Sequence, residues 1–249
     1  MEQLRTLVPL EWCFVWLSAP ELDLGNKSLG GQLSPFIGNL SFLRWIFLSD
    51  NNFYGIIPNE VSFLFKLETL ILANSSFSGE IPTAIGNLLK LETLHLANNH
   101  LTGQFPASIG NLSALLLLDV HYNSLSGTIP YSVGELRSLE ELGLSGNSIY
   151  GMVPPPIFNI YSLTILSLAL NRLDGSLPHN ICYDLPKLKL FTVYSSNNFS
   201  GPLPYSLANT SNRNYFSGFK NLSFLSLSEN NLGTGTGNDL HFLTSINCS

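Results

Sequence analysis

Charged residues are scarce in this chain. Lys and Arg number 11 and Asp and Glu number 17 among 249 residues, so charged types make up 11% of the sequence, well below the roughly 25% of an ordinary soluble domain. The net charge is −6, and the sequence contains no run of Lys or Arg. Such a chain offers no basic surface to a phosphate backbone or an anionic lipid, so we expect no nucleic acid and no membrane surface among its partners.

Cysteine and long hydrophobic runs are scarce as well. The three cysteines, Cys13, Cys182 and Cys248, are too few and too scattered for a disulfide framework or a zinc site. No window approaches the roughly 18 uninterrupted apolar residues of a membrane-spanning helix, although the mean hydropathy is +0.21. Pro9 and Glu11 break the apolar stretch at 8–19, so we expect neither a membrane span nor a clear signal peptide in this chain.

Hydrophobic residues, by contrast, make up 45% of the chain, and they repeat at a fixed step along it. Glycine shows this step at Gly31, Gly55, Gly79, Gly103, Gly127, Gly151 and Gly175. Two apolar columns keep the same step, one at Leu22, Ile46, Leu70, Leu94, Leu118, Leu142 and Leu166, and one at Leu24, Leu48, Leu72, Leu96, Val120, Leu144 and Leu168. Because residues two apart on a strand point to the same side, each unit predicts a short strand with two inward side chains.

The repeat determines the expected fold. A unit of 24 residues, which is the step from Gly31 to Gly55, cannot bury its own apolar face, so neighbouring units must stack with their strands side by side and parallel. We therefore predict an α/β repeat solenoid of about nine such units that forms one domain over residues 19–249. Residues 1–18 do not fit the repeat and form a degenerate N-terminal segment, and one unit is expected to be shortened near 206–224.

Asparagine occupies a fixed place three residues after the second inward position. It stands at Asn51, Asn99, Asn123, Asn147 and Asn171, whereas Lys27 and Ser75 replace it in two units. An amide side chain both donates and accepts hydrogen bonds, so we expect stacked asparagines to satisfy backbone groups in the buried turn after each strand. Lys and Ser at this position are expected to hold the turn less well.

The repeating unit has a recognisable form. The segment LETLHLANNHLTGQFPASIGNL at 91–112 shows the pattern LxxLxLxxNxLxGxIPxxIGNL with little variation. This pattern resembles the plant-type leucine-rich repeat. The segments LSPFIGNLSFLR at 33–44 and NNLGTGTGNDLHFLTSINCS at 230–249 are similar to the ectodomains of plant leucine-rich-repeat receptor-like kinases that perceive microbial patterns.

This resemblance implies a curved array with parallel strands on the concave face and short 3₁₀ or irregular segments on the convex face. It also implies a second sheet beside the Gly-x-Ile-Pro part of each unit. The array is expected on the extracellular face of the plasma membrane as part of a longer receptor, or in secreted form. Family members begin with a signal peptide and a cysteine-paired cap, which residues 1–18 do not match, so the first repeat is expected to lack a cap.

The residues of the chain do not favour catalysis. The Val-Ala-x-Lys, His-Arg-Asp and Asp-Phe-Gly sequences of a kinase do not occur, and GTGTG at 233–237 lacks phosphate-binding spacing. His95 and His121 fall on neighbouring predicted strands with Asp119 near them, which would suit a weak metal site or pH sensor, but a solvated polar rib is the favoured interpretation. We therefore predict no enzymatic activity, no cofactor and no bound metal.

Residues that flank the inward positions are expected to form an exposed ribbon on the concave face. Exposed aromatic residues there are typical of a recognition surface, although cover for an uncapped edge would explain Trp45 and Phe47 equally well. The predicted ligand-binding positions are Trp45, Phe47, Ile71, His95, Asp119, His121, Tyr122 and Glu141. The expected partners are a peptide or protein ligand and a co-receptor with a leucine-rich-repeat ectodomain.

Eight Asn-x-Ser/Thr sequons occur along the chain, and they fit a secreted, glycan-covered surface. A glycan cover would also compensate for the scarcity of charge. The predicted glycosylation sites are Asn26, Asn39, Asn74, Asn111, Asn198, Asn209, Asn221 and Asn247.

The favoured function is a non-catalytic recognition module, part of a cell-surface receptor ectodomain that binds a peptide, a microbial elicitor or a co-receptor. Two alternatives stay open at this point. One is a secreted inhibitor of a microbial wall-degrading enzyme. The other is a truncated product without independent activity.

Overall fold

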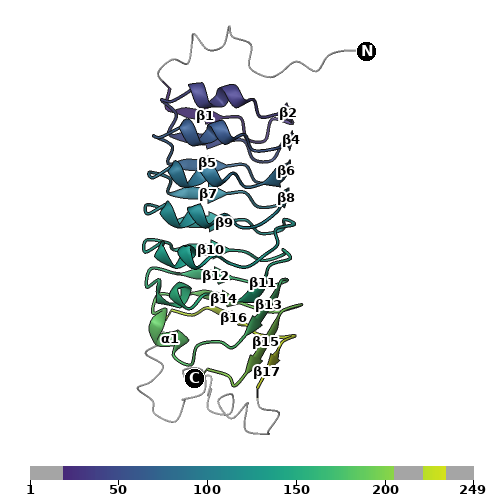
Figure 1. The fold of residues 1–249 in the computed structure, drawn as a ribbon, viewed down its shortest axis with the longest axis vertical. Helices are drawn as coiled ribbons and strands as arrows, with labels where there is room; N and C mark the ends of the chain where they lie inside the picture. Colours follow the sequence, from purple (N-terminus) through teal and green to yellow (C-terminus); the bar gives the residue numbers. More distant parts are fainter. Residues whose placement is uncertain (1–18, 205–220, 234–249) are drawn as a thin grey trace.

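The computed structural model describes residues 19–204 and 221–233, which form a stack of repeating units (Figure 1). In these residues the main sheet has nine parallel strands, and their order in the sheet is their order along the chain. They are β1 (Glu21–Asp23), β3 (Trp45–Phe47), β5 (Thr69–Ile71), β7 (Thr93–His95), β9 (Leu117–Asp119), β10 (Glu141–Gly143), β12 (Ile165–Ser167), β14 (Leu190–Thr192) and β16 (Phe224–Ser226). The predicted solenoid is therefore confirmed.

The main-sheet strands from β3 to β12 bury their middle residue and turn the other two toward the concave face. In β7, Leu94 is fully buried, whereas Thr93 and His95 are partly exposed. Leu96, just beyond the strand, is buried as well. The two inward columns thus form one continuous core along the stack. Burial of one Leu side chain contributes roughly 1.5–3 kcal/mol, and each layer covers the next, which is why a single unit has no stability of its own.

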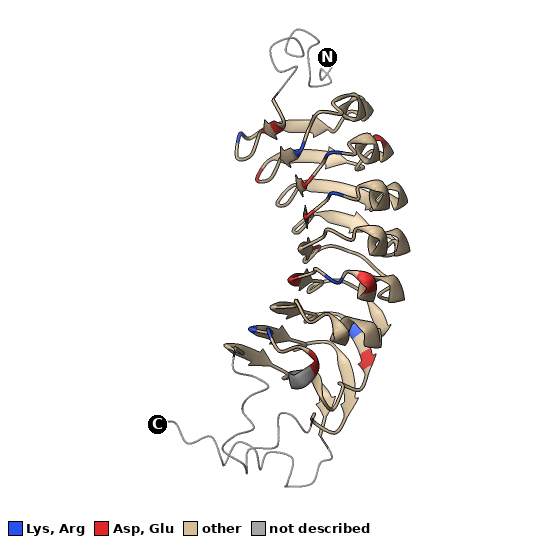
Figure 2. Ribbon diagram, turned by 90° about the vertical axis from the view of Figure 1, so that its left-hand side faces the viewer, with Lys and Arg blue, Asp and Glu red and all other residues tan. Residues whose placement is uncertain are grey.

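Short 3₁₀ helices line the opposite, convex side of the curved stack (Figure 2). They are η1 (Pro35–Asn39), η2 (Asn59–Phe63), η3 (Thr83–Asn87), η4 (Ala107–Asn111), η5 (Tyr131–Glu135) and η6 (Pro155–Asn159). A proline such as Pro106, with φ at −71°, precedes each helix from η2 to η6. Adjacent helices pack so closely that a Cβ on Gly110 would lie 2.4 Å from the carbonyl oxygen of Ser132. The close approach at this layer therefore leaves no room for a side chain at position 110.

A second layer of strands lies beside the Gly-x-Ile-Pro part of the units, as the resemblance implied. One sheet contains β2 (Gly30–Gln32), β4 (Asn52–Gly55), β6 (Ser76–Glu80) and β8 (His100–Thr102). The other contains β11 (Tyr150–Met152), β13 (Arg172–Gly175), β15 (Asn198–Gly201) and β17 (Asn231–Leu232). An isolated bridge between Gln104 and Ser126 occupies the interval between the two sheets. The repeat glycines have positive φ here, for example 77° at Gly103, so the chain turns where L-residues with side chains are disfavoured.

The asparagine column satisfies the buried turns as predicted. Asn171 is 1% exposed, and its Nδ2 donates to the carbonyl oxygens of Leu144, Leu168 and Ala169 at 3.0–3.2 Å. Its Oδ1 accepts the backbone N–H of Ile149 at 3.1 Å. The same arrangement, with donors and acceptors one unit apart, recurs at Asn51, Asn99, Asn123, Asn147, Asn197 and Asn230.

Two units carry another residue at this place in the turn. The Ser75 hydroxyl donates to the carbonyl oxygen of Asn51 at 3.4 Å. Lys27 contributes its backbone N–H, which donates to Oδ1 of Asn51 at 3.2 Å. A hydroxyl has one donor and an ammonium has no acceptor, so neither side chain can reproduce the set of bonds that an asparagine makes.

The period lengthens after Gly175. A short helix, α1 (Ile181–Asp184), takes the place of the 3₁₀ helix, and Ile165 pairs with Leu190, one position later than the regular step predicts. Leu190 then pairs with Phe224, at a much longer separation along the chain. The described strands β14 and β16 are hydrogen-bonded neighbours. Most of the expected shortened unit near 206–224 lies outside the described residues, so it stays a prediction.

Some predictions fall outside the described residues. They concern the degenerate segment 1–18, Cys13 and Cys248, the sequons at Asn209 and Asn247, and most of GTGTG at 233–237. Within 19–204 and 221–233, no helix is long and apolar enough to cross a membrane.

Candidate ligand-binding face

The predicted ribbon follows the concave face layer by layer. Its members are Trp45 and Phe47 on β3, Ile71 on β5, His95 on β7, Asp119 on β9 and Glu141 on β10, with His121 and Tyr122 just after β9. Tyr122 is exposed, but the others are half-buried, because equivalent side chains on strands about 4.8 Å apart cover one another. The ring of Trp45 also lies under the guanidinium of Arg44, 4.9 Å from the ring centre.

Three ionisable side chains converge on this face. Nδ1 of His121 lies 2.5 Å from Oδ1 of Asp119, and Nε2 of His95 lies 3.5 Å from Oδ2 of Asp119. The backbone N–H of His121 donates to the same Oδ1 at 3.1 Å. Burial lowers the pKa of His95 below its ordinary value of 6.5, while the Asp119 carboxylate opposes this shift. The His95 imidazole is therefore held in its neutral form at neutral pH.

Two glycines leave the space that this arrangement needs. Gly143 pairs in register with Asp119, and a Cβ on it would lie 2.5 Å from Oδ1 of Asp119. A Cβ on Gly146 would lie 2.5 Å from the ring of Tyr122. Tyr122 itself has a φ of 49°, so a left-handed turn carries its ring. The absence of side chains at 143 and 146 lets Asp119 and Tyr122 extend over the neighbouring layer.

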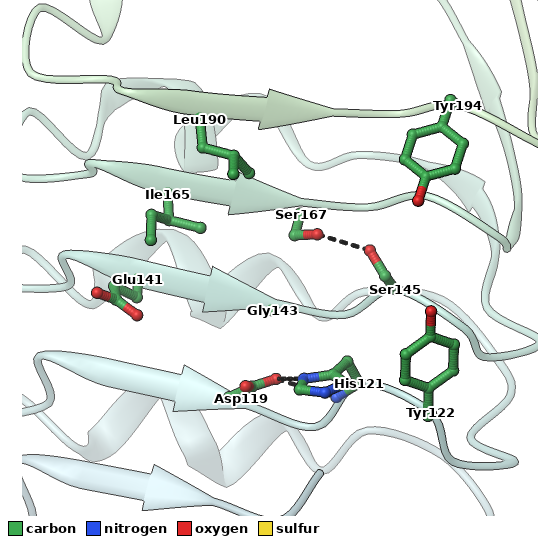
Figure 3. Close-up of a pocket in the computed structure, with 10 residues that line it drawn as sticks. All are labelled: Asp119, His121, Tyr122, Glu141, Gly143, Ser145, Ile165, Ser167, Leu190 and Tyr194. Carbon is green, nitrogen blue, oxygen red and sulfur yellow. Dashed lines mark hydrogen bonds and ion pairs between the residues drawn. The ribbon is translucent and has the colours of Figure 1, made fainter. Parts of the chain in front are cut away.

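An open depression of about 320 Å³ lies next to these side chains (Figure 3). Its floor includes Gly143 and the hydroxyls of Ser145 and Ser167, which hydrogen-bond to each other at 2.7 Å. Tyr122 and Tyr194 stand at one end with their hydroxyls directed toward each other. The other lining residues are Asp119, His121, Glu141, Ile165 and Leu190.

The lining combines apolar, aromatic and acidic groups. Ile165 and Leu190 offer apolar surface beside the two tyrosine rings, and Glu141 and Asp119 add negative charge. A side chain with an apolar stem and a cationic end, such as Lys or Arg, matches this combination. The face is therefore chemically suited to hold a basic side chain of a ligand.

The structure unites only part of the predicted site. Four predicted positions line the depression: Asp119, His121, Tyr122 and Glu141. His95 contacts the first of these from β7. Trp45, Phe47 and Ile71 lie two or three strands away in the sheet and form a separate part of the same face. The role of each position in ligand binding stays a prediction.

The predicted positions lack six of the ten lining residues, among them Ile165 of β12. Leu190 lies one residue beyond the position that the regular period indicates, because the register slips after β12. Tyr194 was not singled out, although it lies three regular steps after Tyr122. Gly143, Ser145 and Ser167 keep the period, but small side chains carry no hydrophobic or charge signal. To find a hollow on this face from the sequence, one must note where the residues beside the inward positions have small side chains. One must also allow for the one-residue shift in register after β12.

Six of the eight predicted glycosylation sites lie in the described residues, and all six asparagines are exposed. They are Asn26, Asn39, Asn74, Asn111, Asn198 and Asn221. Asn39 and Asn111 end η1 and η4 on the convex side, and Asn198 begins β15 in the second layer. None of the six stands within a strand of the main sheet, so glycans attached to them would start outside the concave strands.

Comparisons with known proteins agree with this geometry. Residues 31–196 match the family described as "Leucine-rich repeat region". Over 47 residues the chain is 53% identical to the LRR receptor-like serine/threonine-protein kinase EFR of Arabidopsis thaliana, a match that covers 19% of this chain and 5% of that protein.

Solved structures extend the likeness over most of the chain. The Arabidopsis receptor kinase HAESA, in complex with the peptide hormone IDA and the co-receptor SERK1, aligns with a TM-score of 0.77 and 34% identity over 86% of this chain and 34% of the other. The ectodomain of GASSHO1/SCHENGEN3 from Arabidopsis thaliana, in complex with CASPARIAN STRIP INTEGRITY FACTOR 2, aligns with a TM-score of 0.71 and 35% identity over 82% and 23%.

The chain thus spans about a third or less of each of these relatives. The family match itself covers well over half of this chain. Parallel main-sheet strands, convex 3₁₀ helices and the asparagine column recur throughout that matched segment. The chain therefore belongs to the leucine-rich-repeat family and is similar to the ectodomains of plant leucine-rich-repeat receptor kinases.

Proposed function

We propose that this chain is a non-catalytic recognition module of an extracellular receptor array, and that the depression between β9 and β14 binds one side chain of a peptide ligand. The observation that carries the proposal is the depression itself. It opens on the concave face, where Tyr122 and Tyr194 flank apolar and acidic groups. Tyrosines around a hollow are typical anchors of a binding surface.

The relatives support a peptide as the class of ligand. The structure of HAESA contains a peptide hormone and a co-receptor. The similarity to HAESA covers 86% of this chain. The scarcity of charge on the surface (Figure 2) and the exposed sequon asparagines fit an extracellular, glycosylated array. For the co-receptor, we propose a protein with a leucine-rich-repeat ectodomain.

The acidic residues of the depression indicate which side chain of a peptide it would bind. Glu141 and Asp119 border the depression from neighbouring strands. Their charges favour a Lys or Arg in the ligand over an acidic residue. Ile165 and Leu190 accept the aliphatic stem of such a side chain.

The test uses a phage-displayed random peptide library, selected on the glycosylated full chain. Peptides that bind at the depression should contain Lys or Arg and should lose roughly 2 kcal/mol, about 30-fold in affinity, on the Tyr122→Ala variant. Ile165→Arg, which places a cation in the hollow, should abolish their binding. Tyr150→Ala changes an exposed tyrosine of β11 in the second layer and serves as the matched control. Selected peptides that bind Ile165→Arg as well as they bind the wild type would overturn the proposal.

A further inference from the structure

We propose that His95, Asp119 and His121 form a binding site for a divalent transition-metal ion of the zinc class on the concave face. One ligand atom from each of the three side chains lies within 4.8 Å of the other two. The sequence favoured a solvated polar rib at these positions. Convergence of the three groups in the folded chain instead provides two imidazoles and one carboxylate, a donor set that Zn²⁺ accepts in proteins together with one open coordination position.

The distances are close to those of an occupied site. With bonds of about 2.0–2.2 Å to a tetrahedral ion, the ligand atoms stand roughly 3.3–3.5 Å apart. Nε2 of His95 is already 3.5 Å from Oδ2 of Asp119. Nδ1 of His121 is 2.5 Å from Oδ1 of Asp119, so this pair has to open by about 0.8 Å when an ion replaces the shared proton. The two side chains are 22% and 30% exposed, which leaves them room to rotate apart.

The surroundings favour a cation at this point. Asp50 and Glu141 are near enough to interact electrostatically with His95, in addition to Asp119. The backbone N–H of His121 holds Oδ1 of Asp119, so the carboxylate is oriented before an ion arrives, as second hydrogen bonds orient metal ligands elsewhere. Gly143 keeps the space over β10 clear of a side chain that would push Asp119 aside.

The three side chains are partly shielded from solvent. The side chains of His95, Asp119 and His121 keep only 32%, 22% and 30% of their surface exposed. The open coordination position would face the concave side, beside the depression that Asp119 and His121 line. The metal site stands on its own geometry and does not require that a peptide bind there.

The experiment titrates the chelator-treated full chain with ZnCl₂ by isothermal calorimetry in a non-coordinating buffer at pH 7.5. We expect one tightly bound Zn²⁺ per chain. Loss of a residue that only orients a metal ligand typically lowers metal affinity about 10–100-fold. The variant His95→Ala with His121→Ala, which loses two ligands, should lose at least that much. His100→Ala is the matched control, because this exposed histidine of β8 lies in the second layer. Absence of tight Zn²⁺ binding, or equal affinity in the double variant, would overturn the site.

A second measurement needs no variant and therefore remains informative if the double variant misfolds. Diethyl pyrocarbonate modifies accessible imidazoles, and mass spectrometry locates the modified peptides. Zn²⁺ should protect His95 and His121 from modification and leave His100 reactive. Protection of other histidines without these two would show adventitious binding elsewhere and refute the proposal.

Discussion

Replacement of Asn171 by alanine tests the central claim about what holds adjacent units together. Asn171 is 1% exposed and bridges two layers, since its Oδ1 accepts the N–H of Ile149 in the preceding unit while its Nδ2 donates to three carbonyl oxygens. Alanine removes all four bonds and adds no strain. The buried backbone groups are then left without their side-chain partner.

The expected magnitude follows from those groups. Leaving the buried N–H of Ile149 without its acceptor costs about 1–3 kcal/mol, and each carbonyl that loses a donor adds up to roughly 1 kcal/mol. Bonds that share one side chain are not additive, so we expect the free energy of unfolding to fall by about 3 kcal/mol. For a chain of this size that corresponds to a melting temperature lower by about 6–12 °C.

The assay is urea unfolding of the full chain followed by far-ultraviolet circular dichroism. Asn87→Ala is the matched control, because Asn87 is an exposed asparagine at the end of η3. This variant should stay within about 0.5 kcal/mol of the wild type. If Asn171→Ala is equally benign, the asparagine column is not what secures the buried turns, and the argument fails.

Three further substitutions can be measured by the same unfolding titration. Gly110→Ala should lower the free energy of unfolding by about 2 kcal/mol, because the new Cβ meets the backbone of the next 3₁₀ helix. Gly30→Ala, where the nearest atom to the new Cβ is 3.4 Å away, should lower it less. Equal losses in the two variants would contradict the close-stacking argument. Ser75→Asn should raise stability by about 1 kcal/mol if it completes the asparagine column, and a loss of stability would show that the turn there cannot accept an amide. Leu118→Ala removes a fully buried side chain and should cost about 2–5 kcal/mol, against less than about 1 kcal/mol for Leu89→Ala at a 59% exposed position.

The repeat made the fold predictable because its determinants are local and periodic. Leu94 and Leu118 are paired core residues in the structure, and their spacing is the regular step that is visible in the sequence. Any stack that aligns equivalent residues buries such a column, so no long-range information is needed. The slip in register at β14, where Ile165 pairs with Leu190, escaped prediction, because the spacing of the inward residues does not show where one extra residue is accommodated.

The candidate site was predictable only in outline. The positions of Asp119 and His121 on the concave face follow from the strand alternation, and the structure puts them there. Tyr194 lies three regular steps after Tyr122 in the sequence, but the register slip at β14 places it in the column of His121 in the structure. Trp45 drew attention as an aromatic residue, but it lies three strands from β9 and does not border the hollow.

The sequence by itself determined the architecture, the orientation of the two inward columns, the role of asparagine in the turns and the absence of kinase motifs. These depend on residue type and spacing within one unit, which repetition copies along the chain. Only the tertiary structure decided where the concave face is hollow and which charged groups meet. The hollow and the charged cluster both depend on contacts between neighbouring units. Gly143 has no side chain, which leaves room for the carboxylate of Asp119, and this carboxylate lies between His95 and His121.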